Sequence, residues 1–423
     1  MAALRTRLLM LLVEVLVIGS DHLLAVNGQG DGWINLLTFN AGLSGTANIT
    51  AFAEQRKPKL LESIAAPNGP WSNADIVCLQ EVFNPQDRLD VVKKARDAGF
   101  TYNYSTGLLE TESELAGMAC SAQRDRSHLA VLSRCLKKNC PDALDVTAAI
   151  PCLFGECSEP VTGLRQTCIE CLGDVRGSGI DDTATACTLS SPAMDYASNL
   201  GLMLLSKKPL EHSSLTAFSD APTPFRRGYI RSDVEGVGTV FCAHNFPNFE
   251  TLPHLYPAFA ARNLKQLQTL IDVASGHNSI VMGDMNSGPE VADSDVQATF
   301  VQSYNYATSR GFVSPYVDQA NAAPDCTFCE TNPINEAIFM GLPINKTILD
   351  HIFINPQVFE VNADQTKRVF TENVITIDGD TSIPLSDHYG VQVSIRAAAP
   401  AMLAATSLLP WLAMAAGLTL PQI

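Results

Sequence analysis

The hydrophobic and polar positions of this chain divide into short apolar runs, which predict buried strands, and stretches with helical periodicity. The clearest run covers residues 279–282, is too short for a helix and leads into a polar turn at residues 283–289. A helical pattern at residues 257–274 precedes it, and a strand is predicted before that at residues 237–244. Strand, helix and strand together predict a crossover unit. Further strands are expected at 33–40, 75–81, 201–206, 228–234, 347–354 and 389–395, and further helices at 59–65 and 85–98.

Polar side chains stand at the ends of these predicted strands, where a purely structural strand would not need them. The run at 279–282 is followed by Asp284 and Asn286, which are two residues apart, so their side chains are expected to face the same side of the strand. For this stretch alone a structural turn is an equal alternative, because Asp, Asn and Gly are common turn residues. Asp350 interrupts an apolar run, where a carboxylate is costly without a partner. The remaining strand ends carry Asn40, Glu81, His244, Asp387 and His388.

Together these strand ends supply oxygen ligands for Mg²⁺ and two imidazoles for proton transfer, the parts that a metal-assisted hydrolysis requires. Their order along residues 33–396 resembles the endonuclease/exonuclease/phosphatase superfamily, which includes DNase I-like nucleases, neutral sphingomyelinases and inositol-phosphate phosphatases. The motifs that carry the resemblance include Leu79-Gln80-Glu81, Gly283-Asp284-Met285-Asn286 and Ser386-Asp387-His388. The resemblance implies an α/β (α+β) fold, a four-layer sandwich of two packed mixed β-sheets flanked by helices, with a cysteine-rich insertion.

The resemblance also implies a metal site and a base. Glu81, helped by Asn40 and Asp387, would hold a divalent cation, Mg²⁺ or another, which would polarise a phosphoryl oxygen. Asp284 would orient or deprotonate the attacking water, and Asn286 would bond phosphate oxygens.

Two histidines receive roles in the same way. His388, oriented by Asp350, would face the phosphate, and His244 would protonate the leaving oxygen. The sequence departs from the family pattern beside both groups. Members often have Thr-His-Leu where this chain has Ala243-His244-Asn245, and Asp-Tyr where it has Asp350-His351. The first departure weakens the role of His244, whereas the second leaves Asp350 in place.

The overall charge bears on the substrate. The 423-residue chain has a formal net charge of −16. A strongly acidic protein does not bind nucleic acid by counterion release unless metal ions or a local basic patch reverse the field. Basic pairs such as Lys137-Lys138 and Arg226-Arg227 are scattered, and we expect them to be solvated surface.

Cysteines concentrate in residues 107–190, which hold eight of the twelve and show little sustained periodicity, so this segment is predicted to be an insertion. In a secretory chain such a set predicts a disulfide framework. The alternative is a zinc site built from Cys168-x-x-Cys171 and Cys326-x-x-Cys329. Cys78 and Cys242 lie inside predicted strands and are expected to be buried thiols.

Both termini indicate export. Residues 1–25 have the basic and apolar regions of a signal peptide, and Asn48, Asn103 and Asn345 begin glycosylation sequons. Residues 397–423 carry no charge and predict a C-terminal hydrophobic anchor or GPI signal, with a final packed helix as the alternative. We therefore expect a protein that is secreted or held at the extracellular face of the cell membrane.

These expectations define the predicted function. Residues 33–396 would form a divalent-metal-dependent phosphodiesterase. A sphingomyelinase-like phospholipase C acting on a lipid headgroup is preferred, and a DNase I-like endonuclease acting on nucleic acid is the alternative. A hypothesis of another class is a catalytically inactive surface binding protein on the same scaffold. The retained polar set argues against it.

Overall fold

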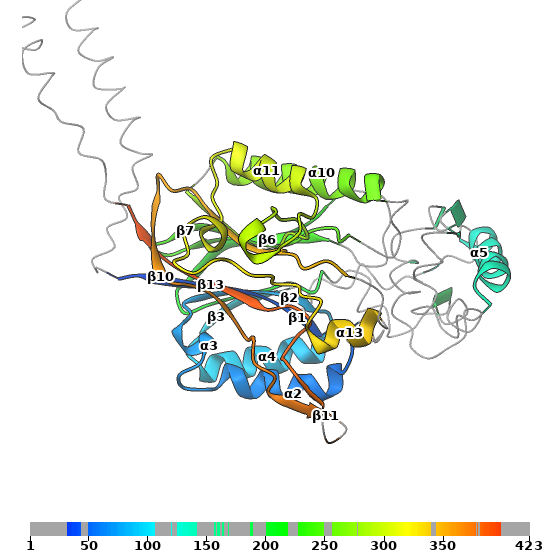
Figure 1. Ribbon diagram of the computed structural model, residues 1–423, viewed down its shortest axis with the longest axis horizontal. Helices are drawn as coiled ribbons and strands as arrows, with labels where there is room; N and C mark the ends of the chain where they lie inside the picture. The colour runs from blue at the N-terminus through cyan, green and yellow to red at the C-terminus, as the bar shows by residue number, and fades with distance from the viewer. Residues whose placement is uncertain are drawn as a thin grey trace, which may run out of the picture.

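The computed structural model consists of two mixed β-sheets packed face to face with helices on the outer faces, so the predicted four-layer α/β fold is confirmed (Figure 1). It describes residues 32–43, 50–105, 120, 125–141, 156–157, 159–160, 163–164, 168, 187–188, 200–218, 227–248, 256–276, 278–339, 344–377, 379 and 381–398. The predicted signal peptide, Asn48, most of the insertion and residues 399–423 lie outside the described residues.

The first sheet has the strand order β10-β13-β1-β2-β4-β3. β1 and β2 are parallel neighbours, and the other pairings are antiparallel. β1 and β2 are almost wholly buried because one face packs on helices and the other on the second sheet. The strands are β1 (Ile34–Leu43), β2 (Ile76–Val82), β3 (Tyr102–Ser105), β4 (Met203–Ser206), β10 (Phe359–Val369) and β13 (Gly390–Ala397).

The second sheet has the order β5-β6-β7-β8-β9. β7 and β8 are parallel and are joined by helix α10, so the predicted crossover unit is confirmed. Its elements are β5 (Leu210–Ala217), β6 (Gly228–Val234), β7 (Gly238–His244), α10 (Tyr256–Ala274), β8 (Ser279–Asp284) and β9 (Asp350–Ile354).

Helices cover the outer face of each sheet (Figure 1). α10 buries Leu267, Leu270 and Ile271 against Phe241 and Val281 of the second sheet. On the other side α4 begins after Asn84, whose side-chain oxygen accepts the N–H of Gln86 at 2.8 Å. The remaining elements are α2 (Ala53–Ile64), α3 (Pro70–Asn73), α4 (Pro85–Asp97), α5 (Arg126–Asn139), η4 (Ala292–Ser294), α11 (Val301–Ser309), α12 (Pro315–Asp318), α13 (Pro333–Phe339), β11 (Ile375–Ile377) and β12 (Thr381–Ile383).

A disulfide crosses the core between the two sheets. Cys78 of β2 and Cys242 of β7 are bonded, so the prediction of two buried thiols is wrong. Both strands were expected, but their side chains face each other only because the sheets pack together. The bond links strands that are 164 residues apart in sequence, two residues before His244 and three before Glu81.

The other cysteine predictions are also decided. Cys120 is bonded to Cys168, Cys135 to Cys157 and Cys326 to Cys329, and the described residues include no free cysteine. The disulfide prediction is thereby confirmed for these cysteines, and the zinc hypothesis is wrong, since bonded cysteines have no thiolate to offer.

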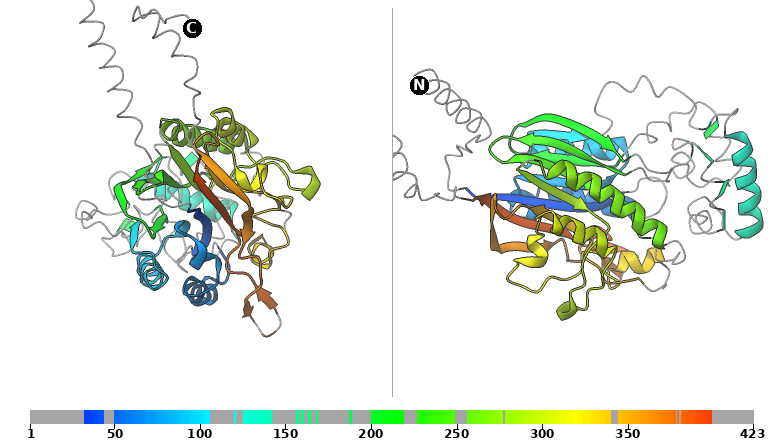
Figure 2. Two further views of the ribbon diagram at one scale, coloured as in Figure 1. Left: turned by 90° about the vertical axis from the view of Figure 1, so that its left-hand side faces the viewer. Right: turned by 90° about the horizontal axis from the view of Figure 1, so that it is seen from above.

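The insertion contains a helix that we did not expect. α5 buries Leu129, Leu132 and Leu136 on one face, although we predicted little periodicity there. The described chain enters at β1 and leaves at β13 at one end of the sandwich, and α5 lies beyond the opposite end (Figure 2). Ala397, which we assigned to the C-terminal anchor, is the last residue of β13 and pairs with Phe359. Among the described residues, no helix has the length and apolar character needed to span a bilayer.

Candidate active site

The strand ends predicted from the sequence meet at the end of the sandwich that faces α5. β1 and β2 run in parallel in one sheet and β7 and β8 in the other, so each pair presents its C-terminal ends together. Asn40 and Glu81 therefore face His244 and Asp284 across the two sheets. Nδ2 of Asn40 donates to Oδ2 of Asp284 at 3.0 Å, and Nε2 of His244 lies 3.9 Å from Oε1 of Glu81.

Asp284 makes two sets of contacts, one with each carboxyl oxygen. Oδ1 accepts the backbone N–H of Asn286 at 2.9 Å, which is the turn-closing bond of a structural Asp. Oδ2 accepts a hydrogen bond from Nδ2 of Asn40 and lies 3.3 Å from Nε2 of His244. The structural-turn interpretation of this stretch is therefore confirmed, and the catalytic role of Asp284 stays a prediction. Burial acts to raise the pKa of Asp284, but His244 and His388 hold it below its usual value, so the carboxylate is ionised at neutral pH.

Gly283 allows β8 to lie close to β7 just before Asp284, because no larger residue fits between the two strands. Its φ is +151°, and an added Cβ would lie 1.9 Å from the carbonyl oxygen of Ala243. Asn286, which follows, has a left-handed φ of 50°, a conformation that Asn tolerates better than most residues. Its Nδ2 donates to the carbonyl of Asn245 at 3.0 Å, which leaves one N–H of the amide for another acceptor.

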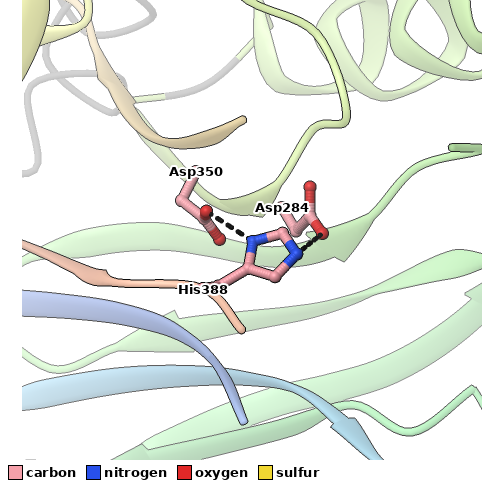
Figure 3. Close-up of side chains that lie close together, drawn as sticks. All are labelled: Asp284, Asp350 and His388. Carbon is pink, nitrogen blue, oxygen red and sulfur yellow. Dashed lines mark hydrogen bonds and ion pairs between the residues drawn. The ribbon is translucent and has the colours of Figure 1, made fainter. Parts of the chain in front are cut away.

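His388 and Asp350 form a hydrogen-bonded pair beside Asp284 (Figure 3). Nδ1 of His388 lies 2.9 Å from Oδ2 of Asp350, and Nε2 lies 3.9 Å from Oδ2 of Asp284. Burial acts to lower the pKa of His388, but the two carboxylates raise it to about 10. Burial raises the pKa of Asp350 to about 6, with His388 opposing the rise. At neutral pH the pair is thus an imidazolium held by a carboxylate, with Nε2–H directed into the site.

Two arginines lie beside the candidate site. Arg56 was not singled out in the sequence, and the expectation that Arg227 is solvated surface is wrong. Arg227 is buried, and its Nη2 lies 4.0 Å from Oε1 of Glu81. Burial, then Arg227, lowers the pKa of His244 to about 4, so this imidazole is neutral. Arg56 is fully buried and donates to the carbonyl oxygens of Ala41, Gly42 and Leu385, which ties the end of β1 to the segment before Asp387. A basic residue whose guanidinium is buried leaves no signal in the local sequence pattern.

Glu81, Asp387 and Asn40 are the groups best suited to a divalent cation. Burial, with repulsion from Asp387 and Asp284, raises the pKa of Glu81 to about 7, and Arg227 opposes the rise. Oδ1 of Asp387 lies against Gly42, where an added Cβ would be 2.5 Å away. Carboxylate oxygens that repel one another in a buried site are the donor set that Mg²⁺ prefers, and a cation would relieve the repulsion. The chemistry of this donor set suits such an ion, and the assignment of these residues as its ligands stays a prediction.

Asp284, Asp350 and His388 form another candidate group for a metal ion. Atoms of Asp284, Asp350 and His388 all lie within 4.8 Å of one another. Here, however, the His388–Asp350 hydrogen bond uses Nδ1, and the imidazolium already supplies the positive charge that the carboxylates require. Glu81 and Asp387 therefore remain the predicted cation ligands.

Known structures resemble the chain at low identity. SmcL is 13% identical with a TM-score of 0.47, covering 87% of this chain and 100% of SmcL. Sphingomyelinase C from Streptomyces griseocarneus is 16% identical with a TM-score of 0.44, covering 86% and 99%. TDP2 from D. rerio, in complex with a single-stranded DNA product, is 11% identical with a TM-score of 0.46, covering 86% and 100%.

The family is decided by sequence. No curated protein matches the chain. A sequence model of the Endonuclease/Exonuclease/phosphatase family, whose members are typically phosphoester hydrolases, matches residues 37–388. That match covers most of the chain and includes each strand end that forms the site. The chain therefore belongs to the Endonuclease/Exonuclease/phosphatase family.

Proposed function

We propose that the chain is a divalent-metal-dependent phosphodiesterase, and that residues 33–396 form its catalytic domain. The observation that carries the proposal is the position of the Asp284 carboxylate. It lies between the neutral imidazole of His244, at 3.3 Å, and the imidazolium of His388, at 3.9 Å. A buried ionised base beside a fixed cationic donor suits the attack of water on a phosphodiester.

Glu81, Asp387 and Asn40 hold the cation, which we take to be Mg²⁺. When bound, the ion polarises a phosphoryl oxygen and neutralises charge that develops on the phosphate. Asn40 also donates to Asp284, so one amide joins the cation ligands to the base.

Asp284 orients the attacking water and takes its proton as the water oxygen attacks phosphorus. The bond between phosphorus and the leaving oxygen breaks, and the leaving oxygen takes a proton from solvent water. Asn40 and His244 keep Oδ2 in place, and the Asn286 N–H keeps Oδ1 in place. His388, charged and anchored by Asp350, directs Nε2–H toward the phosphate oxygens. Asn286 adds the remaining N–H of its amide.

His244 receives a different role from the one expected from the family. We expected it to protonate the leaving oxygen. An imidazole with a pKa of about 4 is neutral at physiological pH and is a poor proton donor. Its Nε2 faces Asp284 and Glu81, so we assign His244 to orient the Asp284 carboxylate.

A single phosphodiester in a lipid headgroup is the preferred substrate. Arg227 is a buried arginine whose Nη2 lies 4.0 Å from Oε1 of Glu81, and a cation there suits a phosphate at the reacting centre. The net charge of −16 disfavours a long polyanion. We therefore prefer a sphingomyelinase-like phospholipase C.

One observation favours the alternative, a DNase I-like endonuclease. α5 carries Arg126, Arg134, Lys137 and Lys138 and no acidic residue, and all four are exposed. It lies beyond the end of the sandwich that bears the site (Figure 1). A basic helix there suits a polyanion that extends beyond the cleaved bond.

We also propose that the protein is exported and held at the membrane through residues after Ala398. The disulfides fit an extracellular protein, since such bonds persist in oxidising compartments. In this arrangement residues 1–25 are a signal peptide and 107–190 an insertion in the catalytic domain.

The test is a panel of phosphodiesters assayed with Mg²⁺ and with EDTA. Sphingomyelin, duplex DNA, RNA and inositol phosphates separate the substrate classes. Asp284→Asn is the inactive control for contaminating hydrolases. Full activity after exhaustive chelation would reject the metal, and no activity on any substrate would favour the inactive binding protein.

A further inference from the structure

The segment between α12 and α13 contains a turn closed by the disulfide between Cys326 and Cys329, whose Cα atoms are 5.4 Å apart. We propose that this disulfide-closed turn, residues 326–329, positions Asp350 against His388, so that activity depends on the bond. The inference rests on the proposed function, because the pair matters only if the site hydrolyses a phosphoester.

One side of the turn holds the start of β9. The Thr327 hydroxyl oxygen accepts the backbone N–H groups of Leu349 and Asp350, at 2.9 and 3.1 Å. The backbone N–H groups of Thr327 and Phe328 both donate to the carbonyl of Thr347, at 2.9 and 3.0 Å. The backbone of Asp350 is thus fixed by a side chain inside the turn.

The other side of the turn holds the segment of His388. The N–H of Tyr389 donates to the carbonyl of Thr327 at 2.7 Å. The ring of Phe328 lies 4.9 Å from the ring of His388, centroid to centroid. Thr327 therefore contacts the backbone on both sides of the pair.

Two asparagines extend this support to the residue before His388. Nδ2 of Asn335 donates to the carbonyl of Cys329 at 3.0 Å and to that of Asp387 at 3.1 Å. Nδ2 of Asn332 also donates to the Asp387 carbonyl, at 3.1 Å. The backbone on either side of His388 is therefore held by the turn and the residues that follow it.

The position of the bond indicates a local role. Asp350 lies in the second sheet, whereas His388 leads into β13 of the first, so no single strand fixes their distance. The turn contacts both segments. A disulfide stabilises a fold mainly by closing a loop in the unfolded chain, and the effect is smallest for short loops. A separation of 3 residues therefore contributes little global stability.

The experiment compares full-length variants on the substrate found active. Cys326→Ser/Cys329→Ser should lower kcat about tenfold or more with KM within about twofold, since about 1.4 kcal/mol is tenfold in rate. Cys120→Ser/Cys168→Ser, which removes a bond of the insertion outside α5, is the control and should leave kcat unchanged. Thr327→Val should reproduce the loss and Thr327→Ser should restore activity. Wild-type kcat in either the double serine variant or Thr327→Val would overturn the proposal.

A second measurement does not depend on activity. The Nδ1–H proton of His388 should give a downfield ¹H NMR signal that is absent in His388→Gln. It should shift in Thr327→Val and in the double serine variant, and stay in place in Thr327→Ser. If the signal moves while no substrate is hydrolysed, the proposed function fails and the positioning role stands. If substrate is hydrolysed and the signal stays in place in the variants, the positioning role fails. If the double serine variant does not fold, the result for Thr327→Val decides between these outcomes.

Discussion

His388 and Asp350 belong to different sheets, yet Nδ1 of His388 lies within hydrogen-bond distance of Oδ2 of Asp350, at 2.9 Å. Asp350 opens β9 of the second sheet, and His388 stands two residues before β13 of the first. Their geometry is thus a property of how the sheets pack. The same holds for Asn40 and Asp284, whose contact also joins the two sheets.

The pair should behave as one unit in mutagenesis. Asp350→Asn removes the carboxylate that keeps His388 charged and oriented, so we expect it to lose much of the activity lost in His388→Ala. The double variant should then be little worse than His388→Ala alone, because residues that act together are not additive. Turnover of the four proteins measures this. Fully additive losses would show that the two residues act separately.

Asp284→Asn should lower kcat by a factor on the order of 10² or more with folding intact. The substitution keeps the volume and most hydrogen bonds but removes the basic carboxylate. Asp272→Asn, at an exposed position on α10, is the matched control and should keep full turnover. If Asp284 only closes the turn with Asn286, the variant would cost at most about 1 kcal/mol of stability and leave kcat alone. Turnover and melting temperature on the same samples separate these outcomes.

The sequence predicted the polar residues at the strand ends better than it predicted the contacts around them. Asp284, His244 and Glu81 end buried strands, and a buried run that stops at a polar residue is visible in a single sequence. The partner of Cys78 and the burial of Arg227 were not predictable, because each depends on a contact between segments far apart in the chain. β5 and β10 were not predicted. They lie at sheet edges, and because their residues are mostly exposed or half-buried, their sequences lack the apolar pattern of a buried strand.

Ending the chain after Ala398 should release a soluble and active protein. The structure sets this boundary, because Ala397 pairs with Phe359 and the N–H of Ala398 donates to Val358. Cutting after Arg396 would remove a strand pair. Fractionation of cells that express both forms is the measurement, and phosphatidylinositol-specific phospholipase C distinguishes a GPI anchor from a helix. Full-length protein found free in the medium would contradict membrane attachment.

Glu81→Gln should raise the Mg²⁺ concentration needed for half-maximal activity by about tenfold or more, since one charged ligand is lost. At saturating Mg²⁺, kcat should fall by a smaller factor than the factor by which the Mg²⁺ requirement rises. Glu290→Gln, an exposed position after the Asn286 turn, serves as the control. Titration of activity with Mg²⁺ gives both values. An unchanged requirement would remove Glu81 from the cation site.

The raised pKa of Glu81 makes the effect of Mg²⁺ on stability depend on pH. Its carboxyl has a usual pKa of 4.5 and a folded value of about 7, so the folded protein holds this proton more tightly than the unfolded chain. Without metal, the contribution is present below the unfolded pKa and is lost as pH rises through about 7. Mg²⁺ binds the carboxylate and restores stability, so it should raise the melting temperature more at about pH 8 than at about pH 5.5. In Glu81→Gln most of this difference between the two pH values should be lost. If Mg²⁺ raises the melting temperature of the wild type equally at both pH values, Glu81 does not exchange its proton for the cation.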